Sequence, residues 1–514
     1  MSSHPNTENS EAEDLPIRLL LRFSGEISTK AAPTRKHFIS RMRKNIKEAL
    51  KNAQIPARFD RSHNRIFIDV ASEDAIPIVS RVFGVQSLSR VEMRAGESLE
   101  EILASGVELF ADQVKNKRFA VRARRVGERS HLPFTSHDVE KQLGAALFPL
   151  AAGVDLTQPE VTVGIELYEG KAYFFSERVA GQAGLPIGTE GKALCLISGG
   201  FDSPVAAWQM LRRGICLDYL FCNMGGSAHQ LDVLGVAKVL ADNWSYGSRP
   251  RLHAVDFEPV MRAIQDHVDR RYWQVVLKRL MVRTADALAE EIKAIALVKG
   301  DAVGQVSSQT LQNIAVVSRA TSLPILRPVV GMNKEEIIKQ SKWVGTYELA
   351  SQIQEHCAMV SRGPATAAKL NDIERQEEYL EKSRVSELLT ELIATRSIFD
   401  LRNLDLKAQA LPGLAIQEIP EDAVIVDLRS KAAYTGWHYG EALHLEFNQA
   451  LTAYKTFDPD QTYVFYCEYE IKSAQLAELL SKRSVRAHHF KGGLKALIRY
   501  AGERGLPTPE LIIG

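Results

Sequence analysis

The chain carries a short glycine and serine motif between a strand pattern and a helix pattern, and this combination can hold a nucleotide. Residues 198–204 read Ser-Gly-Gly-Phe-Asp-Ser-Pro. The motif follows the apolar run 193–197 and precedes the helix-like run 205–208. Because Gly199 and Gly200 have no Cβ, several backbone N–H groups can approach a phosphate there, and the helix amino terminus adds a positive dipole. The motif therefore predicts a phosphate-binding turn.

An ordinary kinase P-loop is a competing interpretation, because Gly191 and Lys192 stand just upstream of the motif. The spacing of G-x-x-x-x-G-K-[ST] does not fit, since its first glycine would fall on Pro186 and Ala193 stands where Ser or Thr should bind magnesium. The Ser-Gly-Gly-x-Asp-Ser pattern instead resembles the PP-loop ATP pyrophosphatases. That resemblance implies cleavage of ATP between its α and β phosphates and transfer of AMP to a carbonyl oxygen. A simple glycine-rich turn before a helix is the alternative.

Length and composition indicate several independent domains. The chain of 514 residues corresponds to about three to four domains at roughly 150 residues each. Its 64 Lys and Arg nearly balance its 63 Asp and Glu, so affinity for nucleic acid must come from local patches. Five cysteines without a C-x-x-C pair argue against a secreted disulfide scaffold and against structural zinc. Residues 1–14 form an expected disordered tail, and the lack of a long apolar stretch predicts a cytoplasmic protein without a membrane segment.

Two small α+β modules are expected ahead of the glycine motif. Residues 15–74 combine a strand over 17–23, a helix over 34–51 and a strand over 65–70. Residues 75–180 end in a hairpin-like pair of strands. The second module resembles a THUMP domain, and the first resembles the ferredoxin-like domain that often precedes one. This pairing implies RNA binding.

Basic residues gather in both of these modules. Eight of them lie between Lys30 and Lys51 against a single acid, although a solvated helix face would give the same pattern. In the second module, apolar residues alternate with Arg122 and Arg124, so one strand face is expected to be buried and the other basic. We expect Arg122, Arg124 and Arg125 to contact a folded RNA through its backbone.

Residues 185–395 alternate strands and helices in the way a doubly wound parallel sheet does. Strands are expected over 217–221, 252–257 and 294–298. Ligands of such sheets bind at the carboxyl ends of the strands, near the point where the strand order reverses. The polar stretch 300–310 follows the last of these strands, so we expect it to face the nucleotide together with the glycine motif.

The last module, residues 417–514, follows a linker over 396–416 and places Cys467 directly after an expected strand at 462–466. This order resembles a rhodanese domain, an α/β domain in which such a cysteine carries a persulfide in a loop that opens onto a helix. Converging loop N–H groups and a helix amino terminus stabilise a thiolate or persulfide anion.

The residues after Cys467 depart from the rhodanese pattern, which favours glycine and basic residues there. Glu468 and Glu470 flank the cysteine, and only Lys472 is basic. Exposed charges are damped over a Debye length of ~8 Å, so we expect a modest opposition to a thiolate. A degenerate domain in which Cys467 is a bystander is the alternative.

Taken together, the glycine motif, the stretch 300–310 and the flanking modules resemble the tRNA 4-thiouridine synthetase family, also called tRNA sulfurtransferases. The resemblance covers nearly the whole chain. It implies that ATP with Mg²⁺ adenylates the C4 oxygen of the uridine at the eighth position of tRNA, after which persulfide sulfur displaces AMP. A cysteine desulfurase would load Cys467, and the same sulfur would feed a sulfur carrier protein of thiazole formation in thiamine synthesis. The family also implies a homodimer.

The resemblance assigns roles to individual residues. Cys357 matches a second cysteine of the family, which attacks the persulfide and forms a transient disulfide with Cys467. Asp202 would hold the metal at the pyrophosphate, and Lys334 matches a lysine implicated in adenylation, an exposed lysine at a helix start being the alternative. The expected ATP-binding residues are Leu196, Ile197, Ser198, Gly199, Gly200, Ser203, Lys278, Gly300 and Gln309.

Two other functions stay open at this point. An amidating or lysine-ligating PP-loop enzyme that modifies RNA would need no rhodanese module. A non-catalytic RNA-binding or sulfur-relay protein would not bind ATP. Mass analysis of tRNA from cells that lack the chain would separate these functions from tRNA thiolation.

Overall fold

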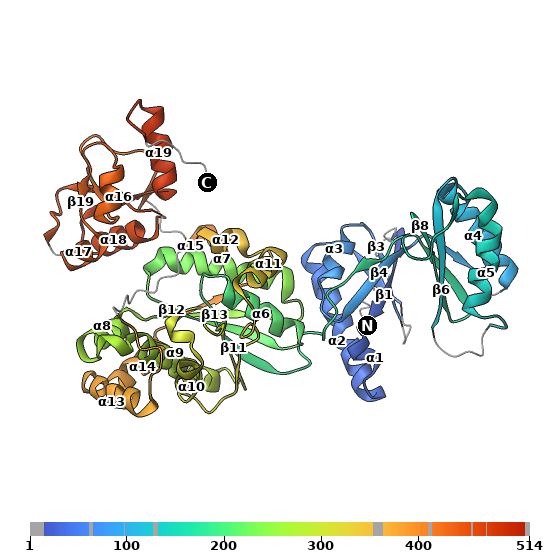
Figure 1. Ribbon diagram of the computed structural model, residues 1–514, viewed down its shortest axis with the longest axis horizontal. Coiled ribbons are helices and arrows are strands. Elements are labelled where there is room, and N and C mark those ends of the chain that lie inside the picture. Colours follow the sequence, from blue (N-terminus) through green and yellow to red (C-terminus); the bar gives the residue numbers. More distant parts are fainter. Residues whose placement is uncertain are drawn as a thin grey trace, which may run out of the picture. The chain divides into compact units, whose positions relative to one another are not determined.

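The computed structural model describes residues 15–60, 65–96, 98–126, 132–352, 363–409, 414–453, 456–468 and 470–508. The chain forms two compact units, one made of Met1–Glu190 with Arg212–Gly214 and the other of Gly191–Leu211 with Ile215–Gly514. Figure 1 shows their helices and strands. The tail expected over residues 1–14, like Cys357, lies outside the described residues. No helix in the described part of the chain has the length and apolar composition needed to cross a membrane.

The first sheet of the first unit has the strand order β10-β4-β1-β3-β2, and all of its pairings are antiparallel. Its central strand β1 is almost entirely buried, with Leu19, Leu20 and Leu21 fully enclosed. The strands are β1 Ile17–Phe23, β2 Ala57–Phe59, β3 Ile66–Val70, β4 Val85–Val91 and β10 Val179–Ala180, and the helices are α1 Gly25–Ser28, α2 Ala32–Asn52 and α3 Ala75–Ser80. The strand expected over 17–23 is therefore confirmed.

One helix of this module starts earlier than expected, and its sheet extends past residue 74. The helix expected over 34–51 begins at Ala32, because Pro33 lies in its first turn, where a missing N–H removes no intrahelical bond. The boundary expected between residues 74 and 75 does not end the sheet. Buried β1 has backbone groups to pair on both edges, and β4 pairs with it along one of them.

The second sheet of the first unit mixes parallel and antiparallel pairs in the order β5-β9-β8-β6-β7. Strand β6 runs parallel to β8, and β8 forms an antiparallel hairpin with β9, as expected. Helices α4 and α5 pack on this sheet, and Ser98 and Thr135 cap their first turns. The elements are β5 Met93–Ala95, α4 Leu99–Val114, β6 Arg118–Val126, α5 Ser136–Leu147, a 3₁₀ turn Phe148–Leu150, β7 Gly153–Val154, β8 Val161–Tyr168 and β9 Lys171–Phe175.

A buried charge cluster ties the two sheets of the first unit together. Arg22 on β1 donates to Glu166 on β8 at 2.8 Å, and Arg65 donates to the other oxygen of the same carboxylate. Arg22 is 5% exposed and Glu166 is 1% exposed. Removing one partner of such a buried cluster would strand an uncompensated charge, at a cost of about 3–5 kcal/mol. The two sheets are therefore held in one register.

The six-stranded sheet of the second unit has the order β15-β14-β11-β12-β13-β16. Five of its strands are parallel, and β16 joins antiparallel at the edge beside β13. The strands are β11 Lys192–Leu196, β12 Cys216–Asn223, β13 Arg251–Asp256, β14 Leu297–Val298, β15 Ile325–Leu326 and β16 Ser397–Asp400. Because β12 and β14 lie on opposite sides of β11, the strand order reverses there, and this confirms the expected doubly wound fold.

Helices cover both faces of this sheet (Figure 1). On one face, α8, α9, α13 and α14 build an apolar core with Leu194, Leu220 and Leu297 of the strands. On the other face, Trp208 of α6 and Trp244 of α7 pack edge to face, with ring centroids 5.5 Å apart. The helices are α6 Asp202–Arg212, α7 Gly226–Trp244, α8 Glu258–His267, α9 Trp273–Glu291, α10 Leu311–Ser318, α11 Lys334–Val344, α12 Tyr347–Gln352, α13 Leu370–Leu380 and α14 Val385–Ala394, with 3₁₀ turns at Arg270–Tyr272, Ser307–Gln309 and Glu381–Ser383.

The last sheet is entirely parallel and has the order β17-β21-β20-β18-β19. Since successive strand side chains point to opposite faces, Phe465 packs with α18 while Val464 and Tyr466 pack with α19. The elements are β17 Ala415–Ile416, β18 Val424–Asp427, α16 Lys431–Gly436, β19 Leu443–His444, α17 Phe447–Thr452, β20 Thr462–Tyr466, α18 Ile471–Ser481, β21 Arg486–Phe490 and α19 Gly493–Glu503. The strand expected over 462–466 is confirmed.

The linker expected over 396–416 is partly built into the sheets that flank it. Its first residues form β16 at the edge of the six-stranded sheet, and its last residues form β17 at the edge of the parallel sheet. Helix α15 Leu406–Gln409 lies between them. Edge strands this short contain too few residues for an alternating pattern, so no strand was expected there.

Candidate active site

The glycine motif forms a turn that is closed by its own serine residues. Ile197 still pairs with the neighbouring strand, since its N–H donates to the Leu220 carbonyl at 2.9 Å. The turn follows, and the Ser198 N–H donates to the hydroxyl of Ser203 at 2.8 Å. The two serine hydroxyl oxygens are 3.1 Å apart. Ser203 lies in the first turn of α6, so the expected strand, turn and helix succession around Gly199 and Gly200 is confirmed.

The loop after β14 approaches this turn so closely that only glycine fits. A Cβ placed on Gly300 would lie 2.6 Å from the Ser203 nitrogen and 2.7 Å from the Asp202 carbonyl carbon. Both atoms belong to the backbone, so neither can move aside without shifting the turn. The carboxyl ends of β11 and β14 therefore meet at the switch point, as the sequence predicted for the motif and the stretch 300–310.

Asp202 and Lys334 form an ion pair at the mouth of this turn. Lys334 Nζ lies 3.1 Å from Asp202 Oδ1 and 5.2 Å from the centroid of the Phe201 ring. The Lys334 side chain is 41% exposed, whereas that of Asp202 is 13% exposed. A bystander lysine at a helix start would point to solvent. Lys334 instead reaches back to the glycine motif.

Helix α11 delivers Lys334 to the site through a capping box. The Asn333 side chain accepts from the Glu336 N–H, and the Glu336 carboxylate accepts from the Asn333 N–H, each at 2.9 Å. Sequence reasoning missed the third member of this group, Gln305. In the amide orientation that satisfies both neighbours, Gln305 donates to Asp202 at 3.1 Å and accepts from Lys334 at 3.0 Å. Its position in the polar stretch 300–310 was the available signal.

A second charge cluster lies at the carboxyl end of β14, and positive charge predominates in it. Asp301 lies 3.2 Å from Lys299, 3.0 Å from Arg327 and 3.9 Å from Lys278. Although burial raises the pKa of the Asp301 carboxyl, Lys299, Lys278 and Arg327 together hold that pKa well below its ordinary value. One carboxylate therefore faces three cations. Lys278 was expected here, while Lys299 and Arg327 were not.

Gln309 offers a buried acceptor that the described residues do not use. The residue is 9% exposed, and its Oε1 atom accepts no hydrogen bond within the described part of the chain. An unsatisfied buried polar group costs free energy unless a ligand pairs with it. The unpaired Gln309 oxygen, the close approach at Gly300 and the three cations beside Asp301 together fit a nucleotide, which supplies hydrogen-bond donors and phosphates.

A metal would find one carboxylate at this site. Within the residues described, His, Cys, Asp and Glu side chains form no group of three or more that would hold an ion. Asp202 lies beside the turn, in contact with Lys334 and Gln305. Mg²⁺ is commonly held by one or two carboxylates together with substrate phosphates, and Asp202 fits that arrangement.

Cys467 lies at the amino terminus of a helix, as the rhodanese pattern predicts. It follows β20 directly, is 4% exposed, and packs in the core beside α18. The Ser473 N–H in the first turn of α18 donates to the sulfur at 3.4 Å. The Ser473 hydroxyl is also 3.4 Å from the sulfur. This geometry stabilises a sulfur anion.

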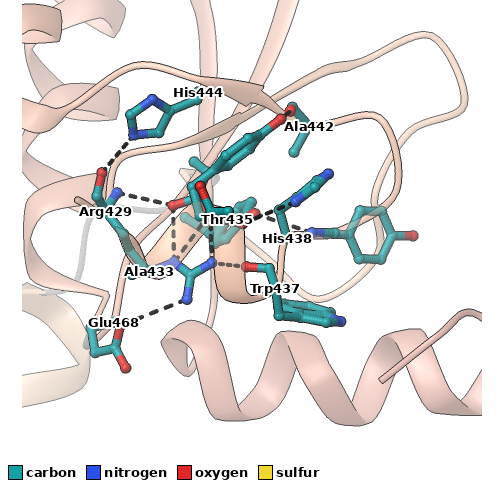
Figure 2. A network of polar contacts seen from close by, with 12 residues as sticks. Arg429, Ala433, Thr435, Trp437, His438, Ala442, His444 and Glu468 are labelled. Carbon is teal, nitrogen blue, oxygen red and sulfur yellow. Dashed lines mark hydrogen bonds and ion pairs between the residues drawn. The ribbon is translucent and has the colours of Figure 1, made fainter. Parts of the chain in front are cut away.

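The two acidic residues of this loop are both engaged by partners elsewhere in the domain. Glu470 accepts from the Gly492 N–H at 2.7 Å and lies 3.2 Å from His489. Glu468 lies 3.9 Å from Arg429. Figure 2 shows Arg429 at the centre of a network of polar contacts that includes Glu468. The carboxylates are thus less free to oppose a thiolate than the sequence alone indicated.

The basic strand of the first unit separates its arginines onto two faces. Arg122 and Arg124 on β6 are exposed, as expected. Arg125 points to the other face, where its guanidinium donates to the Leu132 carbonyl at 3.2 Å and lies over the Phe134 ring. Arg125 therefore does not share the exposed face with the other two. Its place follows from the two-residue period of a strand.

The fold and these sites define a PP-loop ATP pyrophosphatase domain joined to a rhodanese-like domain and to two smaller α+β modules. Comparison with protein families agrees. A family described as "Thiamine biosynthesis protein (ThiI)" matches residues 188–382. The ThiI ferredoxin-like, THUMP and rhodanese-like domain families match residues 18–89, 96–177 and 412–499. The expected multidomain fold is confirmed.

Full-length relatives identify the family. The tRNA sulfurtransferase of Pyrobaculum aerophilum is 37% identical over 488 residues, which cover 94% of this chain and 98% of the relative. That of Marinobacter nauticus is 36% identical over 421 residues, covering 80% and 86%. A solved 4-thiouridine synthetase–RNA complex with bound ATP matches with a TM-score of 0.64 at 28% identity, over 74% of this chain and 99% of that one. The chain belongs to the tRNA sulfurtransferase family.

The contact at Gly300 predicts the effect of a single methyl group. Gly300→Ala would push the loop after β14 away from the turn, an overpacking that costs about 1–3 kcal/mol. We expect ATP to bind roughly ten- to a hundred-fold more weakly, measured by isothermal titration calorimetry. Gly331→Ala is the matched control, because a Cβ there meets nothing within 4 Å. Equal ATP affinity in the two variants would contradict the assignment.

Proposed function

We propose that this chain catalyses the ATP-dependent thiolation of tRNA. AMP is transferred to the C4 oxygen of the uridine at the eighth position, and persulfide sulfur then displaces AMP to give 4-thiouridine. The observation that carries the proposal is the meeting of Gly300 with the turn at Asp202 and Ser203, which builds a nucleotide site in a chain that also holds Cys467 at a helix amino terminus. Membership of the tRNA sulfurtransferase family supports it.

The adenylation half of the reaction uses the charges at the switch point. Lys278, Lys299 and Arg327 bring positive charge to the carboxyl end of β14, where nucleotide phosphates would bind. Asp202 would hold Mg²⁺, which neutralises charge on the pyrophosphate leaving group. Lys334 forms an ion pair with Asp202. When Mg²⁺ binds that carboxylate, the Lys334 ammonium group would be free to contact a phosphate.

The sulfur half of the reaction uses the two cysteines in turn. The Cys467 thiolate attacks the terminal sulfur of a donor persulfide, which forms the Cys467 persulfide and releases the donor thiolate. That persulfide attacks the activated C4 atom and AMP leaves. The Cys357 thiolate then attacks Cys467 Sγ, which forms a disulfide and releases the thiolated uridine. A dithiol reductant restores both thiols.

The first unit would hold the tRNA. Arg122 and Arg124 project from β6, and Lys36, Lys44 and Lys47 are exposed along α2. A solved 4-thiouridine synthetase with this fold was captured with RNA and ATP. Backbone phosphates are the expected target of such surfaces. Arg41 on α2 also donates to the Ile187 carbonyl at 2.8 Å within the unit.

The family resemblance extends the proposal to partners. A cysteine desulfurase would donate the persulfide sulfur to Cys467. The same persulfide would supply a sulfur carrier protein of thiazole formation in thiamine synthesis. The chain would act as a homodimer in the cytoplasm, where its tRNA substrate is found and where a catalytic disulfide is reduced after each turnover.

Removing the charge of Asp202 tests the nucleotide chemistry. Asp202→Asn keeps the shape of the side chain and removes the charge that would hold Mg²⁺. We expect AMP formation to fall by about 10²–10³-fold, with tRNA binding unchanged, measured with radiolabelled ATP and by filter binding. Asp266→Asn is the control, since Asp266 is exposed on α8. Normal AMP formation by the Asp202 variant would exclude a metal-binding role.

A salt titration tests the tRNA surface. Replacing Arg122 and Arg124 by Ala should lower the slope of log affinity against log salt by about two units and leave ATP affinity unchanged. Lys495→Ala with Arg499→Ala removes the same charge from exposed positions on α19 and serves as the control. If the slope stays the same in both double variants, the β6 face is merely solvated.

Substitutions of the two cysteines should block sulfur transfer at different steps. Cys467→Ser should accept no sulfur from a desulfurase, whereas Cys357→Ser should accept it and stall before multiple turnover. Wild-type enzyme quenched after one turnover without reductant should yield a peptide pair joined through both cysteines, seen by mass spectrometry. Cys216→Ser, at the start of β12, is the control. Two free thiols after thiolated tRNA has formed would refute the disulfide mechanism.

A further inference from the structure

Ser473 contacts the sulfur of Cys467 through two separate groups. Its backbone N–H donates to Sγ at 3.4 Å, and its hydroxyl oxygen lies 3.4 Å from the same atom. The hydroxyl also donates to the Glu470 carbonyl at 2.7 Å. Ser473 is fully buried, so bulk water does not compete for these bonds.

We propose that Ser473 is a catalytic residue of the sulfur-carrying step, in which its hydroxyl changes partner with the charge of Cys467. With a neutral thiol, the hydroxyl donates to the Glu470 carbonyl and accepts from S–H, the arrangement that the distances allow. With a thiolate, the hydroxyl turns and donates to sulfur beside the Ser473 N–H. The inference rests on the proposed role of Cys467 as sulfur carrier.

The loop depends on such neutral donors because its side chains supply little positive charge at the sulfur. Lys472 holds its ammonium group 5.8 Å from the centroid of the Phe447 ring. Arg429 makes a fork with Asp427, donates to the Trp437 carbonyl and lies 3.9 Å from Glu468, and Figure 2 shows its contacts with Trp437 and Glu468. His489 faces the Glu470 carboxylate. Lys472 thus lies over an aromatic ring, while Arg429 and His489 face carboxylates, and the Ser473 bonds remain for the sulfur anion.

The chemistry of loading needs that anion. The Cys467 thiolate displaces a thiolate from the terminal sulfur of a cysteine persulfide, so one S–S bond forms, one breaks, and the negative charge passes to the leaving thiolate. A hydrogen bond that stabilises the thiolate raises its population at neutral pH. Hydrogen bonds to charged groups are roughly twice as strong as neutral ones, so the hydroxyl contributes more to the thiolate than to the thiol.

The pH dependence of alkylation tests the role of the hydroxyl on the full chain. Iodoacetamide is applied from pH 6 to pH 10, and the Cys467 peptide is followed by mass spectrometry. We expect Ser473→Ala to raise the midpoint by about one unit and to slow alkylation at neutral pH about ten-fold. Ser481→Ala lies at the far end of the same helix, is exposed, and should leave the midpoint unchanged.

An isosteric pair separates the hydroxyl from the packing. Ser473→Thr and Ser473→Val add nearly the same bulk and differ in the hydroxyl, so the Thr variant should alkylate at a lower midpoint than the Val variant. Equal midpoints in this pair would overturn the proposal, even if Ser473→Ala fails to fold. Alkylation uses neither ATP nor tRNA. Failure of this test is therefore distinct from failure of tRNA thiolation, which the Cys467→Ser variant reports.

Discussion

The nucleotide half of the molecule depends on one contact, the backbone of Gly300 against the first turn of α6. A Cβ at Gly300 would lie 2.6 Å from the Ser203 nitrogen, so the two loops meet without a side chain between them. Neighbouring strands of a doubly wound sheet send their helices to opposite faces at the switch point, which opens a crevice. Lys278 enters this region from α9 and Lys334 from α11. Lys278 lies beside Asp301 and Lys334 beside Asp202, so the contact at Gly300 brings both side chains to one region.

The charges around the crevice are arranged for a ligand more than for stability. Asp301 is buried among Lys278, Lys299 and Arg327, and taking several charged groups out of water costs free energy even when they are paired. The chain accepts that cost at the carboxyl end of β14. The unpaired acceptor of Gln309 is a second example in the same place. Both departures from good packing are explained by a nucleotide that brings anionic phosphates and amino donors, and such departures are expected at functional sites.

The sequence predicted those parts of the fold and site whose signals are local. The turn from Ser198 to Ser203 has a dense pattern, and the strand Ile17–Phe23 is rich in apolar residues, so the sequence places both correctly. Gln305 and Arg327 were missed because only the tertiary fold brings them to Asp202 and Asp301. The alternation on β6 was visible, yet Arg125 was grouped with arginines of the opposite face. The two-residue period of a strand decides on which face a side chain lies, and the number of nearby arginines does not.

The acidic loop of the last domain shows why charge along the sequence is a poor guide to a thiolate site. Glu470 is bound by His489 and the Gly492 N–H, groups on a different strand and turn. Its negative charge is therefore partly neutralised before it acts on Cys467. The sulfur instead meets the amino terminus of α18, whose N–H groups are fixed by the helix and do not depend on side-chain charge. A loop of this kind can lose its basic residues and still stabilise a sulfur anion, provided that the helix starts in the same place.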